Sequence, residues 1–316
     1  MPSPFVENVC LPYLLSAQNA DGGWGFQAGA LSRAEPTAWA MIALYECGST
    51  PAQQASAAQG VRFLENAQLP DGSWASTPEL REGSWVTSVA CLALVQHGLL
   101  SDRLTRGIDW LSRELPGEAG WLHRAIRRLF GKNNTGQDAS YFGWSWTAGT
   151  ASWVEPTSYA ILLLRLLPAA LRSEASERRL RIGESMLYDR MCPGGGWNCG
   201  NPMVYGVPGE PQVTSTVWAL LALREHPERS EVQKSLSWLE GFSKSVKSPA
   251  SLALTLIAFH AYERPDAGMG ESLSAMYQTN EILWTVSEVA WASLALSGTQ
   301  KWLQPKFSGA ATAGKK

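Results

Sequence analysis

A short pattern that ends in tryptophan constrains this chain more than any other feature. Two copies agree position for position: YLLSAQNADGGW at 13–24 and FLENAQLPDGSW at 63–74. Weaker copies follow at 110–121 and 186–197, with Leu115 and Met191 in place of the glutamine. A repeat of this kind predicts an array of similar structural units rather than one irregular core.

Each copy has a physical interpretation. An amphipathic helix ends near the glutamine, an Asp-Gly or Gly-Gly pair supplies the positive φ of a tight turn, and tryptophan closes that turn. The glutamine side chain can reach carbonyl and ring N–H groups of the next copy. We therefore expect the turn to connect neighbouring units, which is a structural role and not a chemical one.

Two kinds of helix alternate along the chain. Six segments are apolar on nearly every side: 36–48, 85–98, 156–167, 213–225, 249–262 and 287–298. Six amphipathic segments precede them, near 4–18, 54–67, 102–114, 174–190, 229–241 and 269–279. Helices that are apolar all round belong inside a protein and amphipathic ones outside. The sequence therefore predicts an all-α fold, a single (α/α)6 toroid of six inner and six outer helices.

We expect this toroid to occupy residues 1–303, with a loop and helix insertion at about 115–152 and a flexible tail at 304–316. The net charge of -2 and the pI of 6.1 argue against a nucleic-acid partner. Five cysteines at unrelated spacings fit a reducing compartment. The N-terminus lacks the pattern of a signal peptide, and no run is apolar enough to span a bilayer. These observations predict a cytoplasmic protein, at most peripheral to a membrane.

The aromatic-Leu-x3-Gln-x3-Gly-x-Trp repeat resembles the tryptophan-rich repeat of terpene cyclases and protein prenyltransferases, and the resemblance extends to about residue 300. Members of that superfamily contain one or two alpha-alpha barrels, and this chain has the length for one. The resemblance implies an isoprenoid substrate. The zinc ligands of protein prenyltransferases would fall on Gln212, Thr214 and Trp291, none of which is a credible ligand. The sequence therefore predicts no metal and no cofactor.

Squalene-type cyclases carry an acidic motif that protonates an alkene or epoxide, and oxidosqualene cyclases keep one acid two residues before a threonine. In this sequence that position falls on Glu155, in WVEPT, and on Glu35, in AEPT. The flanking acids of the family motif are replaced by Trp153 and Pro156. By resemblance, Glu155 and Glu35 are the candidate proton donors, with Glu155 preferred because it follows the long insertion.

We expect both glutamates to have a structural role, to which a catalytic role would be an addition. Proline is favoured at the first helical position, where its missing N–H would be unbonded, and an acid just before it meets the positive end of the helix dipole. On this interpretation the Glu-Pro pair marks the start of an inner helix and does nothing more.

Eight aromatic residues at the mouths or centres of the inner helices are candidate substrate-binding residues: Trp39, Trp85, Trp146, Trp153, Tyr159, Trp218, Trp284 and Trp291. Aromatic faces shape a hydrophobic cavity and attract carbocations. The alternative is that these rings fill the toroid axis.

Segment 121–132, WLHRAIRRLFGK, has one apolar and one basic face. It predicts peripheral contact with an anionic membrane surface, although its arginines could instead hold a diphosphate, or the helix could pack on the barrel.

The sequence thus favours a cyclase-like enzyme that starts cyclisation or isomerisation of a polyprenyl substrate with an acid. The alternatives are a toroid that binds isoprenoids without catalysis and, less favoured, a prenyltransferase subunit, whose partner chain the sequence does not identify.

Overall fold

The computed structural model describes residues 2–120, 137–138, 140–280 and 284–305. Its inner helices are α2 (Ala34–Cys47), α4 (Val86–Gln96), α7 (Val154–Leu166), α9 (Val213–Ala222), α11 (Pro249–Ala261) and α13 (Val286–Ala295). Its outer helices are α1 (Leu11–Ser16), which continues the π-helical turn Val6–Cys10, α3 (Pro51–Ala67), α5 (Asp102–Arg113), α8 (Glu174–Asp189), α10 (Ser230–Ser243) and α12 (Met269–Asn280). The predicted all-α toroid is confirmed.

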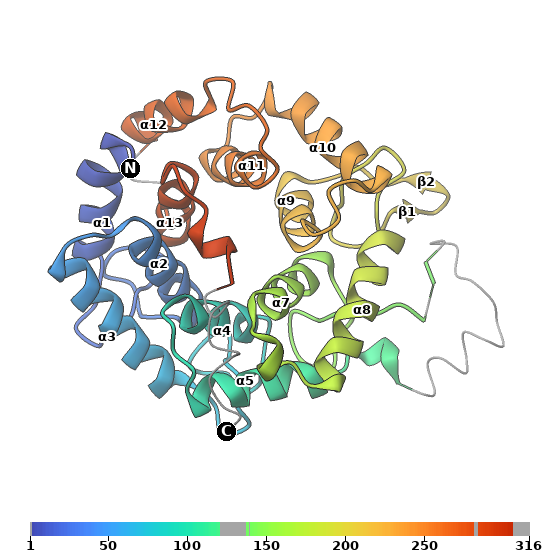
Figure 1. Ribbon diagram of the computed structural model, residues 1–316, viewed down its shortest axis with the longest axis horizontal. Helices are drawn as coiled ribbons and strands as arrows, with labels where there is room; N and C mark the ends of the chain where they lie inside the picture. The colour runs from blue at the N-terminus through green and yellow to red at the C-terminus, as the bar shows by residue number, and fades with distance from the viewer. Residues whose placement is uncertain (1, 121–136, 139, 281–283, 306–316) are drawn as a thin grey trace, which may run out of the picture.

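The inner helices form a ring that closes on itself. Each inner helix packs against the next along the chain, and α13 packs against α2 as well as α11 (Figure 1). Short elements decorate the ring: the 3-10 turns Gly117–Ala119, Ala169–Leu171 and Lys301–Leu303, and the two-stranded hairpin of β1 (Met203–Val204) and β2 (Val207–Pro208). The predicted amphipathic helix 121–132 lies outside the described residues.

The turn tryptophans are buried and fully hydrogen-bonded. The indole Nε1 of Trp24 donates to the carbonyl of Leu14 at 2.7 Å, and its backbone N–H donates to Thr37 Oγ1 at 2.9 Å. Trp74 and Trp197 make the same two bonds, to Leu64 with Thr87 and to Leu187 with Thr216. One residue thus joins the end of an outer helix to the first turn of the inner helix that follows.

The third turn corrects the repeat assigned from the sequence. Trp144 donates its indole N–H to the carbonyl of Leu111 at 2.9 Å, and its backbone N–H to Thr157 Oγ1 at 2.9 Å, whereas the predicted Trp121 lies outside the described residues. This bond from the indole of Trp144 spans 33 positions where the other three span 10, so the stretch between Leu111 and Trp144 contains an insertion within the turn itself. In the sequence, Trp121 stands where an uninterrupted copy would place its tryptophan.

The predicted connecting role of the glutamines is confirmed. Gln18 Nε2 donates to the carbonyl of Gly22 in its own turn and to that of Ser56 in the next outer helix, at 2.8 and 2.9 Å. Gln68 repeats this with Gly72 and with Arg103 of α5, both at 2.8 Å. The turn glycines lie equally close to the next outer helix, since a Cβ on Gly72 would stand 2.6 Å from the carbonyl oxygen of Arg106.

Substitutions at two glycines with positive φ can measure the cost of backbone strain apart from the cost of displacing a packed helix. Gly72 (φ 98°) faces Arg106, whereas a Cβ on Gly98 (φ 69°) would meet nothing within 4 Å. We expect Gly98→Ala to lower the free energy of unfolding by about 1 kcal/mol, the penalty for alanine in a left-handed conformation. Gly72→Ala should cost about 2 kcal/mol more, because α5 must also move away. Urea unfolding measures both, and equal losses would contradict the docking role.

Candidate functional site

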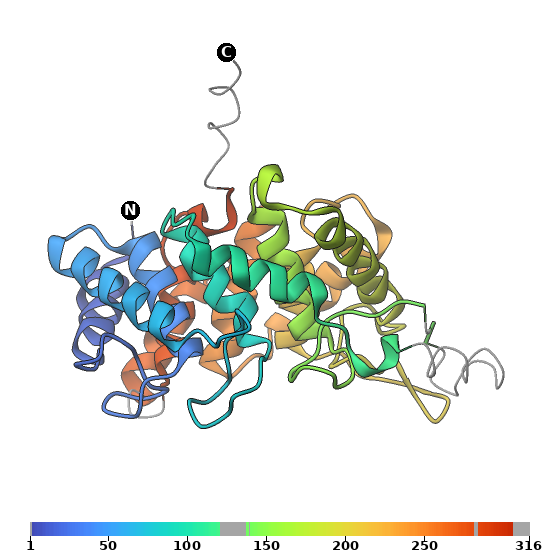
Figure 2. The ribbon, with the colours of Figure 1, turned by 90° about the horizontal axis from the view of Figure 1, so that it is seen from below.

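The six inner helices begin on the same face of the ring. Each follows an outer helix through a turn, so all six run in one direction. Figure 2 shows the loops that precede the inner helices and the β1–β2 hairpin on one side of the ring. We call this side the N-terminal mouth, defined by the first turns of α2, α4, α7, α9, α11 and α13.

Four inner helices carry a threonine that accepts the backbone N–H of a turn tryptophan, and these threonines identify equivalent positions at the N-terminal mouth. Two residues before Thr37, Thr87, Thr157 and Thr216 stand Glu35, Trp85, Glu155 and Thr214. Helices α4 and α9 carry tryptophan and threonine at this position, and they form just as α2 and α7 do with glutamate. These four helix starts therefore share the threonine, and they do not depend on the glutamate.

The helix-start interpretation of the Glu-Pro pair needs a correction in its details. Helices α2 and α7 begin at Ala34 and Val154, so the proline is the third helical residue and not the first. The residues before them, Arg33 and Trp153, make no side-chain capping bond. Each glutamate lies in the first turn, where an ionised carboxylate gains about 0.3–1 kcal/mol from the helix dipole.

Burial outweighs that gain at Glu35. The side chain is half-buried, and burial raises its pKa to about 7. A shift of this size corresponds to about 3 kcal/mol against the ionised form. The stabilisation from the helix dipole is smaller than the cost of burying the charge. Stabilising the helix start therefore does not explain an acid at this position.

Glu155 is also half-buried, and it has a partner from the neighbouring inner helix. Ser215 Oγ, in the first turn of α9, donates to Glu155 Oε1 at 2.8 Å. Burial raises the pKa of Glu155, and the bond from Ser215 lowers it by a smaller amount. The carboxyl group therefore points across the ring wall toward α9 and not into its own helix terminus. Sequence reasoning missed Ser215, since the contact joins residues 60 positions apart.

Tyr159 lies one turn after Glu155 on α7, and the charges of both carboxyl groups act on it. Its side chain is buried, and burial is the main cause that raises its pKa. The charges of Glu155 and then Glu35 raise the pKa of Tyr159 further. Both carboxyl groups are therefore close enough to act on the same phenol.

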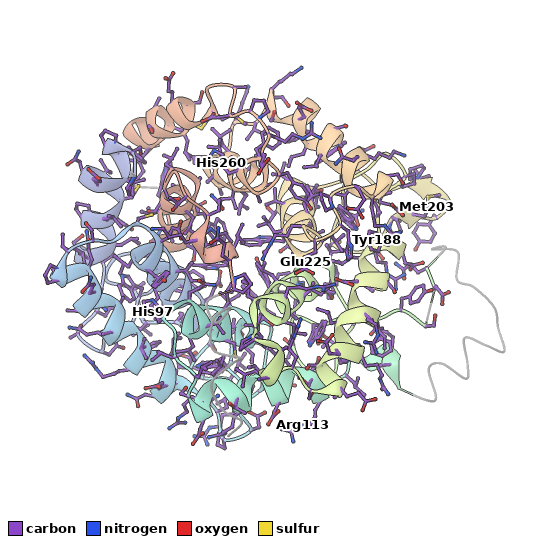
Figure 3. All side chains as sticks on the ribbon, in the orientation of Figure 1. His97, Arg113, Tyr188, Met203, Glu225 and His260 are labelled. Carbon is purple, nitrogen blue, oxygen red and sulfur yellow. The ribbon has the colours of Figure 1, made fainter. Side chains whose placement is uncertain are left out.

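Below this layer, four predicted aromatic residues from four inner helices share one cluster on the ring axis. Trp218 lies 5.1 Å from Trp39 and 4.7 Å from Tyr159 between ring centroids, and Trp291 lies 6.0 Å from Trp39. Figure 3 shows side chains of the inner helices extending into the middle of the ring. We call Trp39, Tyr159, Trp218 and Trp291 the axial cluster.

The other predicted aromatic residues lie around this cluster or away from it. Trp85 stacks on Tyr159 at 5.2 Å and meets Trp146 edge-on at 5.0 Å. Trp153 lines a cavity of about 270 Å³ beside the start of α7, together with Glu118 and Cys199. Trp284 packs edge-on against Tyr277 of the outer helix α12, at 4.6 Å.

The indole N–H groups distinguish the axial tryptophans from the turn tryptophans. The Nε1 atoms of Trp39, Trp218 and Trp291 are buried and have no hydrogen-bond partner among the described residues, and the same holds for Trp284. The turn tryptophans Trp24, Trp74, Trp144 and Trp197 all donate to a carbonyl. A buried donor left unpaired costs about 1–3 kcal/mol, so the axial rings are placed at a cost to stability.

Trp302 adds a fifth ring that the sequence did not indicate. It follows α13 and lies 6.4 Å from Trp39 between centroids, fully buried and with its own Nε1 unpaired among the described residues. Trp39, Trp218 and Trp302 expose at most 1% of their surface, so these rings pack against one another with no water-sized gap around them.

Within the described ranges, no group of three or more His, Cys, Asp or Glu side chains could hold a metal ion. The same part of the chain contains no helix long and apolar enough to cross a membrane.

Comparison with known proteins confirms the resemblance predicted from the repeat. Residues 3–84 match the family model of the squalene-hopene cyclase C-terminal domain. A stretch of 67 residues is 43% identical to drimenyl diphosphate synthase of Streptantibioticus cattleyicolor, covering 21% of this chain and 12% of that protein. A stretch of 133 residues is 29% identical to protostadienol synthase A of Arthroderma gypseum, covering 38% of this chain and 18% of that protein. The chain matches only a small part of either relative's length.

The fold matches a terpene cyclase over nearly its whole length. The type II terpene cyclase MstE from Scytonema superposes with a TM-score of 0.62 at 14% identity, covering 93% of this chain and 97% of that one. A variant of the same cyclase, solved with the substrate geranylgeranyl dihydroxybenzoate, gives a TM-score of 0.57. At this identity the likeness shows a shared fold.

The raised pKa of Glu35 predicts how stability depends on pH. Between about pH 4.5 and 7 the folded protein holds a proton on Glu35 that the unfolded chain has lost, so this group lowers the free energy of unfolding as the pH rises. Glu35→Gln should be up to about 3 kcal/mol more stable than wild type at pH 8, and equally stable at pH 4. Urea unfolding at both pH values measures this, with Glu82→Gln on the exposed loop as control. A constant difference between wild type and Glu35→Gln would refute the burial of this carboxyl.

Proposed function

We propose that this terpene cyclase-like toroid binds an isoprenoid-type molecule at its N-terminal mouth and starts its cyclisation or isomerisation with an acid. Glu155 is the proposed proton donor, and Glu35 is a second carboxyl at the same mouth. The observation that carries the proposal is the pairing of Glu155 with Ser215 directly above the axial cluster.

A proton donor has to hold its proton before the reaction and release it during the reaction. The burial of Glu155 serves the first requirement, and Ser215 serves the second. Burial raises the pKa of Glu155 and so favours the protonated form, which has a proton to give. A hydroxyl that donates to Oε1 stabilises the carboxylate left after transfer, which makes the proton on the other oxygen easier to release. Ser215 thus supplies the helper that the sequence around Glu155 does not contain.

The aromatic rings suit the cation that protonation would create. Tyr159, Trp218 and Trp85 lie next to one another below the carboxyl groups. Aromatic faces attract cations within about 6 Å of the ring centroid, most strongly where water is excluded. In MstE, whose fold this chain shares, the bound substrate carries a geranylgeranyl chain, which supports an isoprenoid ligand.

A second candidate function is isoprenoid binding without catalysis. It is favoured by the close packing of Trp39, Trp218 and Trp302, since a ligand has to displace these rings to enter the axis. On this account the unpaired indole N–H groups donate to a ligand oxygen, and the carboxyl groups transfer no proton. Protein prenylation is less favoured, because Gln212, Thr214 and Trp291 offer no zinc ligands.

Turnover distinguishes the two candidates. Wild type, Glu155→Gln, Glu35→Gln and the exposed control Glu82→Gln are incubated with squalene, its epoxide and linear prenyl diphosphates, and products are identified by mass spectrometry. The acid mechanism predicts a loss of at least about 100-fold in kcat for Glu155→Gln, in line with general acid catalysis, and no loss for Glu82→Gln. Product formation at the wild-type rate by Glu155→Gln would remove Glu155 from the mechanism. Binding without product from any substrate would favour the second candidate.

We also propose that the N-terminal mouth faces a lipid surface. Exposed apolar side chains occur on three loops that precede inner helices: Leu31, Leu80, Val204, Tyr205 and Val207. Tyr205 at the tip of the β1–β2 hairpin is 93% exposed and Leu31 is 72% exposed. Side chains of this kind on one face support shallow insertion into a bilayer.

Sedimentation with phosphatidylcholine vesicles tests this contact. We expect Tyr205→Asp combined with Val207→Asp to reduce the bound fraction severalfold, because charges replace side chains that would enter the bilayer. Phe242→Asp on the outer helix α10 serves as control. Binding that needs anionic lipid and survives the double substitution would instead assign membrane contact to segment 121–132.

A further inference from the structure

A cavity of about 270 Å³ lies at the N-terminal mouth, and no residue of the axial cluster lines it. Its walls come mainly from residues 117–118 after α5, residues 149–153 before α7 and residues 199–201 before β1. Figure 2 shows the β1–β2 hairpin, which begins just after the last of these walls, on the same side of the ring. We call this space the side cavity. It is larger than the share of one water molecule, about 30 Å³, and just below ordinary small-molecule sites of about 300–1,000 Å³.

Hydrogen bonds within the protein hold these walls together. The backbone N–H of Gly117 donates to the carbonyl of Thr150 at 3.0 Å. The backbone N–H of Val154, at the start of α7, donates to the carbonyl of Cys199 at 3.2 Å. The side cavity is therefore formed by bonds that no ligand has to supply.

Glu118 brings a carboxyl group to the side cavity with one oxygen left unpaired. Its Oε1 atom accepts the backbone N–H of Ser152 at 2.8 Å, whereas Oε2 is buried and has no hydrogen-bond partner among the described residues. The buried guanidinium of Arg179 interacts with Glu118 and also with Glu114, from which it lies 3.9 Å away. One positive charge thus faces two carboxyl groups, and a buried charge without a full complement of opposite charge is costly.

The other guanidinium group at the side cavity has its own partner. Arg190, which lines the cavity, donates to Asp189 Oδ2 at 2.5 Å, and Asp189 also accepts the backbone N–H of Asp138. Among the residues that the structure describes, carboxyl groups therefore outnumber guanidinium groups around the side cavity. An excess of negative charge favours a cation in this space and opposes an anion such as phosphate.

Two aromatic side chains complete the lining. Tyr141 is 38% exposed and Trp153 is half-buried, so a ligand in the side cavity meets both without displacing the packed rings of the axis. Aromatic rings attract a cation within about 6 Å of the ring centroid, and proteins use them to recognise quaternary ammonium groups. Such a group donates no hydrogen bond, so the charge of Glu118 attracts it without direct contact to an enclosed oxygen.

We propose that the side cavity binds the quaternary ammonium group of choline, either free or as the headgroup of phosphatidylcholine. Glu118 supplies the opposite charge, and Tyr141 and Trp153 supply the aromatic surface. The proposal goes beyond the acid chemistry assigned to Glu155 and does not depend on it. A β1–β2 hairpin with its tip in a bilayer would hold the side cavity near the lipid headgroups.

Titration calorimetry of the full chain with choline, and with the neutral isostere in which carbon replaces the nitrogen, tests the site. Wild type should bind choline at least about tenfold more tightly than the isostere, because Glu118 and the aromatic rings attract only the cation. Glu118→Gln should lose most of this preference, since glutamine can still accept the N–H of Ser152 but carries no charge. Glu82→Gln, on an exposed loop, should keep the wild-type preference.

A second variant tests the aromatic surface. Tyr141→Leu, at a partly exposed position, should weaken choline binding severalfold, because a ring that attracts the cation is lost. It becomes the deciding variant if thermal unfolding shows that Glu118→Gln does not fold.

Sedimentation with phosphatidylcholine vesicles distinguishes the two sources of choline. If the lipid headgroup occupies the site, free choline and Glu118→Gln each lower the fraction of wild-type protein bound to vesicles. If free choline is the ligand, neither changes that fraction while the calorimetric preference remains. Both results support the site and assign its source.

Equal affinity of wild type for choline and for the isostere would overturn the inference, and so would an unchanged preference in Glu118→Gln. Tighter binding of inorganic phosphate than of choline would also overturn it, since that result would show an anion site. The proposed acid chemistry fails separately, through the absence of product from any isoprenoid. Hairpin insertion fails through vesicle binding that survives the Tyr205→Asp and Val207→Asp substitutions.

Discussion

The whole architecture depends on one hydrogen bond made by a buried indole. Burying tryptophan requires an acceptor for its ring N–H, and in the four turns that acceptor is a leucine carbonyl at the end of the preceding outer helix. The same tryptophan donates its backbone N–H to a threonine in the following inner helix. Each of these four turns is thereby fixed at both ends, so the inner helices α2, α4, α7 and α9 run in the same direction. The common direction brings first turns from several repeats, and with them Glu35 and Glu155, to one mouth.

In contrast to the turn tryptophans, the residues at the centre of the ring lower the stability of the fold. Trp39, Trp218, Trp291 and Trp302 bury indole donors without partners among the described residues, and Glu35 buries a carboxyl whose pKa rises to about 7. A chain chosen only for stability would place apolar residues at these positions. Local departures from good packing and hydrogen bonding tend to gather where a protein binds or reacts. Their convergence on one axis, from separate repeats, is the physical basis for locating the site there.

Much of the fold could be predicted from the sequence because its signals are local. Helices that are apolar all round and amphipathic helices differ in their sequence pattern, and this contrast located the six inner and six outer helices of the ring. Gln18 and Gln68 indicated how neighbouring units connect. Threonine at the inner-helix starts was visible too, and aligning Thr37 with Thr87 and Thr157 would have revealed that the glutamate is dispensable for starting a helix.

The site could be predicted only in part, because its decisive contacts join distant residues. Glu155 meets Ser215 across 60 positions, and Glu46 meets Trp302 across 256. No local pattern distinguishes Trp302 from any other tryptophan near a chain end. The third turn was mispredicted because a local pattern was present but not used. Trp121 has the expected spacing, whereas the tryptophan bonded to Leu111 lies 33 positions after it.

The central claim is that this protein uses tryptophan in two ways, to hold the turns and to contact a ligand on the axis. Indole N–H resonances of a sample labelled with ¹⁵N at tryptophan, assigned by single Trp→Phe variants, report on each ring separately. Addition of farnesol should shift the resonances of Trp39, Trp218, Trp291 and Trp302, and leave those of Trp24, Trp74, Trp144 and Trp197 in place. Shifts confined to the turn tryptophans, or none in either group, would contradict the account.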